Sequence, residues 1–400
     1  MSHYKPYPAY KDSGVEWLGE VPEHWGAGRL RYICQCLDGQ RIPLNAAQRF
    51  DRLGDIPYWG ANSIVDYVDE SLFDEDLVLL GEDGAPFFEP SKPVAFFSQG
   101  KVWPNNHVHV LRPVIRGTGK FIAHVLNVTD YAHFIDGSTR DKLTQGSMKD
   151  IPIPQPPLPE QSAIAAFLDR ETAKIDVLAD KKIRLIELIR EKIVALASQP
   201  PGSPDVAWIR LSHVCDVISR PVLQQGDHSY TKLGLFNRGR GIFRKDATDT
   251  EDMGDSEFFW IQSGDLILSG QFAWEGAVAL ASDEHTGCVV SHRFPVIRGR
   301  VDQTLTEYLF AYFLTHHGDF VLNDCSRGSA GRNRPLNMNA LLSWHIPIPL
   351  MQIQQEIADL VYLHERIGAL IMKSVFLLKE HRSGIIAAAV TGKIDISGAT

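Results

Sequence analysis

Ile151-Pro152-Ile153-Pro154 stands near the middle of this 400-residue chain, and the same four residue types return as Ile346-Pro347-Ile348-Pro349. Each copy is followed by a run typical of a helix start, Glu160-Gln161-Ser162-Ala163-Ile164 in the first case and Gln354-Gln355-Glu356-Ile357 in the second. The two copies lie 195 residues apart, whereas solenoid repeats recur about every 20–50 residues. The pattern therefore predicts one large module that is present twice.

Further pairs of segments keep the same order in both halves of the chain. Asp76–Gly81 (DLVLLG) is similar to Asp265–Gly270 (DLILSG), and Val110-Leu111-Arg112 is similar to Val296-Ile297-Arg298. A segment of small and basic residues also precedes each Ile-Pro-Ile-Pro motif. All the offsets lie between 186 and 195 residues, so a single duplication explains them better than chance does.

Each module is expected to contain a sheet-rich part followed by one long helix. Short apolar runs separated by Gly, Pro, Asp and Asn fill residues 20–150 and 205–345, with brief helices near 121–128 and 305–316. A first long helix is expected to begin at about Pro159, since the next proline is Pro200. The second is expected at about 352–390.

Apolar residues in both helices alternate at spacings of four and three, which is typical of a coiled-coil seam. The predicted helix or subunit interface residues are Ile164, Leu168, Ile175, Leu178, Leu185, Ile189, Leu360, Leu363, Ile367, Leu370 and Leu377. A 38-residue helix is about 57 Å long and needs a partner to cover its apolar face. We therefore predict two α/β (α+β) domains joined by two long antiparallel helices in a pseudo-twofold dumbbell. In the alternative arrangement, these are ordinary core helices of two separate domains.

Composition limits the class of protein. The chain is 44% apolar and has five cysteines without a C-x-x-C pair, which indicates reduced thiols and a cytoplasmic protein. No apolar stretch is long enough to span a membrane, and no membrane partner is expected. The net charge is −9, whereas proteins that hold a polyanion alone usually have a basic surplus. A nucleic-acid partner would therefore need a locally basic face.

The sequence contains no recognisable catalytic constellation. It has no complete phosphate-binding loop, no G-x-S-x-G elbow and no H-E-x-x-H helix. His107 and His109 are two residues apart, but no carboxylate or cysteine close to them in the sequence suggests a metal site. We expect a protein that is not an enzyme and has no metal site.

The polar loops that precede the Ile-Pro-Ile-Pro motifs are the best candidates for function. Arginine among glycine and serine allows close approach to phosphate, and Arg and Asn can also pair with guanine and adenine edges. Similar positive residues occur in other turns of both modules. The predicted DNA-binding residues are Arg41, Lys101, Arg140, Lys142, Gln145, Arg238, Arg240, Arg327, Arg332, Asn333 and Arg334. For each of them, a solvated surface position is the alternative.

Nearly the whole chain resembles the specificity subunit of type I restriction–modification systems. Residues 10–25 (YKDSGVEWLGEVPEHW) are similar to the usual opening of that family, and Trp208-Ile209-Arg210-Leu211 is similar to the opening of its second recognition domain. The first Ile-Pro-Ile-Pro motif and Pro157-Leu158-Pro159-Glu160-Gln161 are similar to its entry into a central helix. The second entry, Pro349-Leu350-Met351-Gln352, departs from this pattern because the proline and acid are missing.

The resemblance implies that each of two target-recognition domains reads one half of a bipartite double-stranded DNA site. The helices would set the spacer and dock two modification subunits, and restriction/translocase subunits would complete the complex. This chain would bind no cofactor; S-adenosylmethionine, ATP and magnesium are expected on the partner subunits. The expected boundaries are 1–155 (first recognition domain), 156–199 (central helix), 200–204 (linker), 205–348 (second recognition domain) and 349–400 (distal helix and tail).

One alternative function is a stand-alone two-domain binding or scaffold protein that dimerises through its helices. It would have no methyltransferase partner and no preference for a bipartite DNA site.

Overall fold

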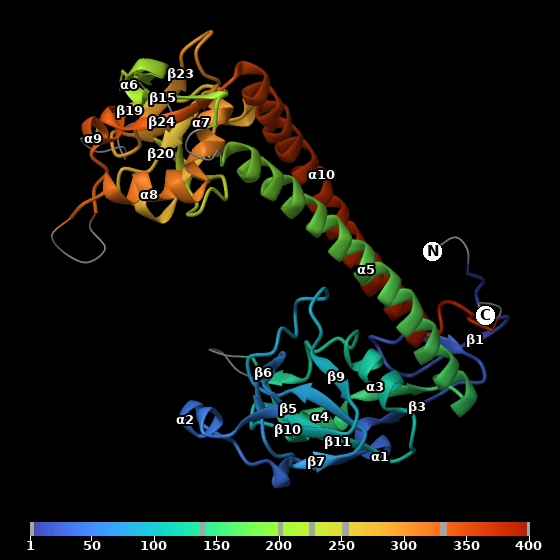
Figure 1. The fold of residues 1–400 in the computed structure, drawn as a ribbon. Helices are drawn as coiled ribbons and strands as arrows, with labels where there is room; N and C mark the ends of the chain where they lie inside the picture. The colour runs from blue at the N-terminus through green and yellow to red at the C-terminus, as the bar shows by residue number, and fades with distance from the viewer. Residues whose placement is uncertain are drawn as a thin grey trace. The chain divides into compact units, whose positions relative to one another are not determined.

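A computed structural model describes residues 4–136, 141–198, 203–223, 229–249, 256–328 and 334–397 (Figure 1). The chain forms two compact units. The first contains residues 1–181 and 373–400, and the second contains residues 182–372. Each unit therefore includes part of both long helices, whereas the predicted boundaries assigned each helix to one segment. In the described part of the chain, no helix combines the length and apolar character that crossing a membrane requires.

The first unit contains two four-stranded sheets, with strand orders β4-β11-β8-β9 and β6-β5-β10-β7. Three strand pairs, β1-β2, β12-β13 and β14-β3, accompany them. The strands are β1 Tyr10–Asp12, β2 Glu20–Pro22, β3 Gly26–Arg29, β4 Cys34–Cys36, β5 Leu53–Trp59, β6 Ile64–Val68, β7 Phe73–Asp74, β8 Leu77–Gly81, β9 Ala95–Ser98, β10 Lys101–Pro104, β11 Val108–Pro113, β12 Ile135–Asp136, β13 Lys142–Leu143 and β14 Pro152–Gln155. The shorter helices are α1 Leu30–Ile33, η1 Asp38–Gln40, α2 Ala46–Phe50, α3 Gly119–Leu126 and α4 Gln145–Asp150.

The second unit repeats this plan with sheets β16-β23-β20-β21 and β18-β17-β22-β19 and the pair β15-β24. Its strands are β15 Val206–Arg210, β16 Cys215–Ile218, β17 Ser229–Leu235, β18 Ile242–Asp249, β19 Phe258–Trp260, β20 Leu266–Leu268, β21 Val278–Leu280, β22 Val289–Ser291, β23 Val296–Gly299 and β24 His345–Pro349. Its shorter helices are α6 Leu211–Val214, η3 Ala273–Glu275, η4 Asp283–His285, α7 Thr306–Phe313, α8 His316–Asp324 and α9 Met338–Ser343. The predicted helix near 305–316 is thus α7, and α8 follows it directly.

The duplication extends to strand pairing. In both units the Ile-Pro-Ile-Pro strand pairs antiparallel with the strand that opens the module: β14 with β3, and β24 with β15. The only parallel contact of each unit's described strands also has the same place, between β10 and β5 and between β22 and β17. The central strands β8 and β20 are buried on both faces, because one face packs against helix α3 or α7 and the other against the second sheet of the same unit. This burial explains their uninterrupted apolar runs.

The two long helices are α5, Leu158–Ala197, and α10, Met351–Val390, and each has 40 residues. A glutamine in the first turn of each helix marks the equivalent start. The Gln161 side chain donates to the Pro156 carbonyl at 2.9 Å, and that of Gln354 donates to the Pro349 carbonyl at the same distance. The second helix therefore starts at the position equivalent to the first, although its sequence lacks the proline and acid.

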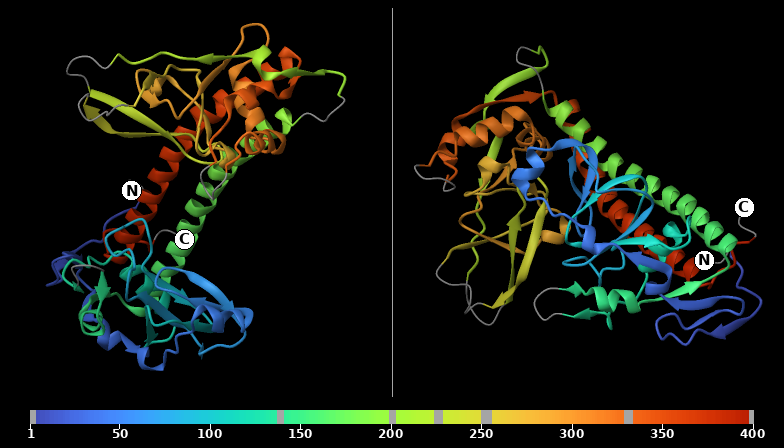
Figure 2. Two further views of the ribbon diagram at one scale, coloured as in Figure 1. Left: turned by 90° about the vertical axis from the view of Figure 1, so that its left-hand side faces the viewer. Right: turned by 90° about the horizontal axis from the view of Figure 1, so that it is seen from below.

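Within each unit the two helices pack side by side and antiparallel (Figures 1 and 2). In the first unit, Ile164 and Leu168 near the start of α5 share a core with Ile385 and Ala389 near the end of α10. In the second unit, Ile193 near the end of α5 packs with Ile357 and Val361 near the start of α10. An ion pair joins the helices in each unit, Arg382–Asp176 at 3.0 Å in the first and Lys192–Glu356 at 3.2 Å in the second.

The predicted seam is correct at some positions and wrong at others. Ile164 and Leu168 are fully buried, and Ile175, Ile189, Leu360 and Ile367 are half-buried. In contrast, five predicted residues are exposed, so their assignment to helix–helix packing is wrong: Leu178, Leu185, Leu363, Leu370 and Leu377. On α10 the buried residues Val361 and Ile371 each lie one residue after a predicted one, Leu360 and Leu370.

Two physical reasons account for these errors. On α5 a strict 3.5-residue repeat rotates about 20° per heptad away from the face that a straight helix buries, so the seam moves from Leu178 to Ala179. On α10, apolar residues cover a wide arc of the helix, so that the exposed Leu370 stands directly beside the buried Ile371 and the two are similarly hydrophobic. Hydropathy alone therefore selects the wrong register. The exposed leucines stay available for the predicted contact with a partner subunit.

Candidate nucleic-acid interface

The turn Phe236–Gly241 between β17 and β18 carries two of the predicted DNA-binding residues, Arg238 and Arg240. Arg238 and Gly239 both have φ of +59°, which is a left-handed conformation that few non-glycine residues adopt. Backbone hydrogen bonds hold this conformation: the Arg238 N–H donates to the Glu275 carbonyl at 3.0 Å, and the Gly239 N–H donates to the Gly276 carbonyl at 2.8 Å. The turn is thus fixed against η3 and its flanking residue.

A surface hollow of about 920 Å³, called here the turn hollow, lies beside this turn. Arg238 and Arg240 line it together with Arg190, which comes from α5. Burial and the nearby charge of Arg240 lower the pKa of Arg190, so the positive groups are close enough to repel each other. The remaining lining residues are Asn237, Trp274, Glu275, Gly276, Phe313, Leu314, Thr315, His316 and Asp319.

A second hollow of about 440 Å³, the α8 hollow, is lined by two more predicted residues, Arg327 and Arg334. His316 and Asp319 line both hollows, so the two adjoin. The guanidinium of Arg334 lies 4.9 Å from the ring centre of Trp274, which lines the turn hollow. The structure therefore brings Arg238, Arg240, Arg327 and Arg334 together, although they are up to 96 residues apart in the sequence.

The described residues that line the two hollows have a positive balance. Five arginines face three carboxylates, namely Arg190, Arg238, Arg240, Arg327 and Arg334 against Glu275, Asp319 and Asp324. The carboxylate of Asp324 is already paired with Arg327, and that of Glu275 accepts a hydrogen bond from the Asn237 amide. On a chain with a net charge of −9, this is a locally basic surface of the kind that an anionic partner requires.

Sequence reasoning missed Arg190, Asn237, Trp274 and His316. Arg190 is in a long helix next to a seam residue, where an arginine usually faces solvent, and only the packing of β17 and β18 brings it to the turn. Asn237 directly precedes the Arg-Gly-Arg-Gly run, and this position was a signal that could have found it. Three predicted residues, Arg140, Arg332 and Asn333, lie outside the described residues.

Of the four predicted residues of the first unit that the structure describes, three converge on one charged cluster and one lies elsewhere. Arg41 donates to the Glu82 carboxylate at 2.6 Å and to the Val108 carbonyl at 2.8 Å. The Lys142 ammonium lies 3.6 Å from Glu82, and the Gln145 amide donates to Asp38 at 3.4 Å. Lys101 is exposed at the start of β10. Arg41 is largely buried and engaged inside the domain, whereas Lys142 and Gln145 remain exposed.

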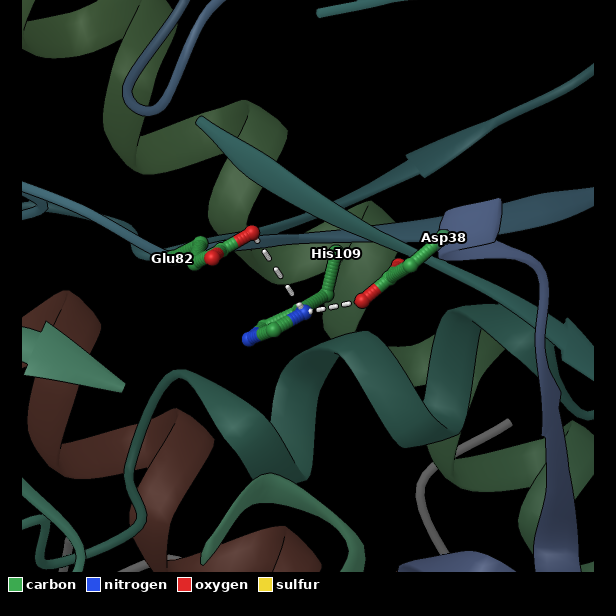
Figure 3. Close-up of side chains that lie close together, drawn as sticks. All are labelled: Asp38, Glu82 and His109. Atoms are coloured by element: carbon green, nitrogen blue, oxygen red, sulfur yellow. Dashed lines mark hydrogen bonds and ion pairs between the residues drawn. The ribbon is translucent and has the colours of Figure 1, made fainter. Parts of the chain in front are cut away.

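The centre of this cluster is His109, which points toward Asp38 and Glu82 (Figure 3). Its Nδ1 lies 2.6 Å from Oδ2 of Asp38, and its Nε2 lies 2.9 Å from the carbonyl oxygen of Leu143. Both neighbours are acceptors, so the doubly protonated ring is the form that satisfies both contacts. His109 is only 1% exposed, and it ties β11 to η1 and to β13, the strand that carries Lys142.

No carboxylate lies close to His109 in the sequence, but folding brings Asp38 and Glu82 to it from distant parts of the chain. These three residue types can bind a divalent cation, and their ligand atoms lie within 4.8 Å of one another. However, the Arg41 guanidinium contacts both carboxylates, at 2.6 Å from Glu82 and 3.7 Å from Asp38. Positive side chains thus already balance these acids, and the arrangement is that of a buried ion network.

The same network determines the acidity of Asp38. Burial alone would raise the pKa of its carboxyl group, but the hydrogen bond and charge of His109, the Val110 N–H and Arg41 outweigh it and hold the pKa at about 2, below the ordinary 3.8. Since the native pKa is lowered, the ionised group stabilises the fold fully above about pH 4. This contribution is lost as the pH falls toward 2.

Asp38→Asn should therefore remove a pH-dependent part of the stability. We expect the difference in unfolding free energy between wild type and variant to shrink by on the order of 2 kcal/mol between pH 5 and pH 2. Urea unfolding at several pH values, followed by tryptophan fluorescence, measures it. A difference that stays constant over this range would show that Asp38 titrates alike in the folded and unfolded chain.

Comparisons with known proteins agree with this architecture. The family described as "Type I restriction modification DNA specificity domain" matches residues 22–188 and again residues 208–370, which corresponds to one match in each copy of the module. A putative type I restriction enzyme specificity subunit from Haemophilus influenzae is 27% identical over 256 residues. That alignment covers 60% of this chain and 64% of the relative, so it spans somewhat less than two thirds of the relative's length.

Two solved structures have a similar fold. One is a chain from a study of complex assembly and conformational transition of the type I restriction–modification system, with a TM-score of 0.58, 17% identity and coverage of 94% of this chain and 99% of that one. The other is the specificity subunit of a type I system from M. genitalium, with a TM-score of 0.53, 11% identity and coverage of 95% and 99%. Because the family matches most of the chain in two copies, this protein belongs to the type I restriction–modification DNA specificity subunit family.

Proposed function

We propose that this protein recognises a bipartite double-stranded DNA site, with one half read by each unit. The observation that supports this most directly is the group of arginines around the turn hollow and the α8 hollow, on a chain that is otherwise acidic. Guanidinium groups suit both phosphate and guanine, and the duplicated sheets provide two scaffolds with different loops. The alternative of a stand-alone scaffold protein is not favoured by membership of this family.

We further propose that the protein acts as a non-catalytic subunit. In this proposal α5 and α10 set the distance between the half-sites and dock two modification subunits, and restriction/translocase subunits join the full complex. S-adenosylmethionine, ATP and magnesium would be bound by those partners. The exposed leucines Leu178, Leu185, Leu363, Leu370 and Leu377 supply apolar surface on the helices for such contacts.

The decisive test of this function is the genome-wide pattern of adenine methylation in source cells with and without the gene. We expect a two-part motif with an unspecified spacer in the presence of the gene and its loss on deletion. A pattern that is unchanged by deletion, in cells shown to express the modification subunit, would contradict the proposal.

The basic turn should contribute to DNA affinity through phosphate contacts. Removing both cations in Arg238→Ala/Arg240→Ala should make the slope of log affinity against log salt concentration shallower by about 2, since each phosphate contact contributes about 0.9. The measurement is DNA binding by the assembled complex at several salt concentrations. Arg184→Ala is the matched control, because Arg184 is exposed on α5, pairs with Glu191 at 2.8 Å and lines neither hollow. An unchanged slope in the double variant would exclude the turn from the DNA contact.

A further inference from the structure

Arg190 links a long helix to the turn that carries Arg238 and Arg240. Its guanidinium donates through Nη2 to the backbone carbonyl of Arg238. Among the described residues no carboxylate forms an ion pair with Arg190, and burial and the charge of Arg240 lower its pKa. An arginine that is partly removed from water and aimed at a backbone carbonyl has a more specific role than a solvated surface charge.

The turn that receives this hydrogen bond needs to be held in place. Arg238 has φ of +59°, a conformation that costs free energy for a residue with a side chain and persists only where the surroundings impose it. The next residue, Gly239, packs closely against Leu314 and Arg190. A Cβ atom at this position would lie 2.2 Å from Cδ2 of Leu314 and 3.5 Å from Nη2 of Arg190. Arg190 and Leu314 thus enclose the turn on the side of the helices.

On the other side, η3 and Gly276 hold the turn through the carbonyls of Glu275 and Gly276 and through the Glu275 side chain on the Asn237 amide. Of these contacts, only that of Arg190 comes from α5, the helix that also packs against α10 in this unit. A displacement of this part of α5 would therefore change the turn directly.

We propose that Arg190, from its place on α5, is a positioning residue that holds the turn Phe236–Gly241 in its left-handed conformation. It thereby sets the direction in which the side chains of Arg238 and Arg240 point. The clamp is a property of the folded chain alone. Its consequence for DNA recognition rests on the proposed function.

Hydrogen–deuterium exchange on the full-length chain tests the clamp without DNA. In Arg190→Ala we expect at least tenfold faster exchange of the Arg238 and Gly239 amides, with Arg190→Lys in between because its ammonium keeps a charged donor group but not the geometry of the guanidinium. Exchange in the sheet strands β20 and β23 should stay unchanged, which shows that the second unit is folded. Arg184→Ala, on the same helix, should leave the turn unchanged. Unaltered protection of the turn in Arg190→Ala would overturn the proposal.

A second substitution distinguishes a role of Arg190 in holding the strained turn from a general loss of packing around it. Glycine adopts positive φ without the cost that a side chain brings. We therefore expect that Arg190→Ala/Arg238→Gly recovers most of the protection of the Gly239 amide. If the double variant exchanges as fast as Arg190→Ala, Arg190 does not act by holding the strained turn, and the proposal is wrong.

The effect on recognition is measured with the assembled complex and two duplexes, one with the methylated motif found in cells and one with its second half scrambled. Arg190→Ala should reduce the discrimination between them about tenfold with an unchanged salt slope. A slope that becomes shallower by about 1 would instead identify Arg190 as a direct phosphate contact and contradict the positioning role. If wild type does not discriminate between the duplexes, the proposed function fails, whereas the exchange result still decides the clamp.

Discussion

Replacing His109 with alanine should lower the free energy of unfolding of the first unit by about 3–5 kcal/mol, because the buried Asp38 carboxylate loses its closest partner and keeps only the Val110 N–H and the more distant Arg41 guanidinium and Gln145 amide. The Asp38 carboxylate would lose its contact at 2.6 Å, and the Leu143 carbonyl would lose the donor at 2.9 Å. Urea unfolding together with hydrogen exchange of the β11 amides measures this loss. The exchange data assign it to the first unit, where β11 lies.

His107→Ala is the matched control for this experiment. His107 is two residues away, but its side chain is 42% exposed and lies 3.4 Å from Asp83, so we expect a loss below about 1 kcal/mol. A double-mutant cycle between Asp38→Asn and His109→Leu should give a coupling of about 1–3 kcal/mol. If His109→Ala costs no more than His107→Ala, the buried network does not stabilise the sheet.

Shortening both long helices by seven residues should shorten the DNA spacer by about three base pairs, since seven helical residues span about 10.5 Å and base pairs rise about 3.4 Å. The deletions Val177–Ile183 in α5 and Ile367–Lys373 in α10 must be combined, because the helices have equal length and pack against each other in both units. Seven residues are nearly two full turns, so the buried faces stay aligned within about 20°.

Methylated adenines mapped in cells that express the shortened subunit with its partners provide the measurement. We expect both half-sites to be unchanged and only the spacer to be shorter. Deleting five residues from each helix is the control: it rotates the faces by about 140° and should abolish methylation. An unchanged spacer in the seven-residue variant would contradict the role of the helices as a ruler.

The parts of the fold that were predictable rest on local signals in the sequence. The Ile-Pro-Ile-Pro strand, the long helix without an interior proline and the Asp-Leu-Val/Ile-Leu run each appear twice in one order, and the structure pairs the strands alike in both units. A duplicated sequence encodes the same pattern of burial twice, so its architecture follows from the repeat. The helix register did not follow, because the apolar arc of α10 is wide enough to allow neighbouring seams.

The candidate site was predictable in composition but not in assembly. Arginine-rich, glycine-rich turns indicated Arg238, Arg240, Arg327 and Arg334, and their residue types alone suggest an anionic partner. The same reasoning failed for Arg41, whose charge is used inside the domain on Glu82. An arginine in a loop has the same sequence signature whether a carboxylate meets it in the fold or not.

By itself, the sequence determined that this protein consists of two copies of one sheet-and-helix module, because periodic apolar runs and prolines act locally along the chain. Only the tertiary structure decided which charges meet. It places Arg190 of α5 against the turn at Arg238, and it encloses His109 between Asp38 and Leu143. Electrostatic interactions and hydrogen bonds act over a few ångströms in space, whatever the separation along the chain, so their partners become defined only when the sheets and helices pack.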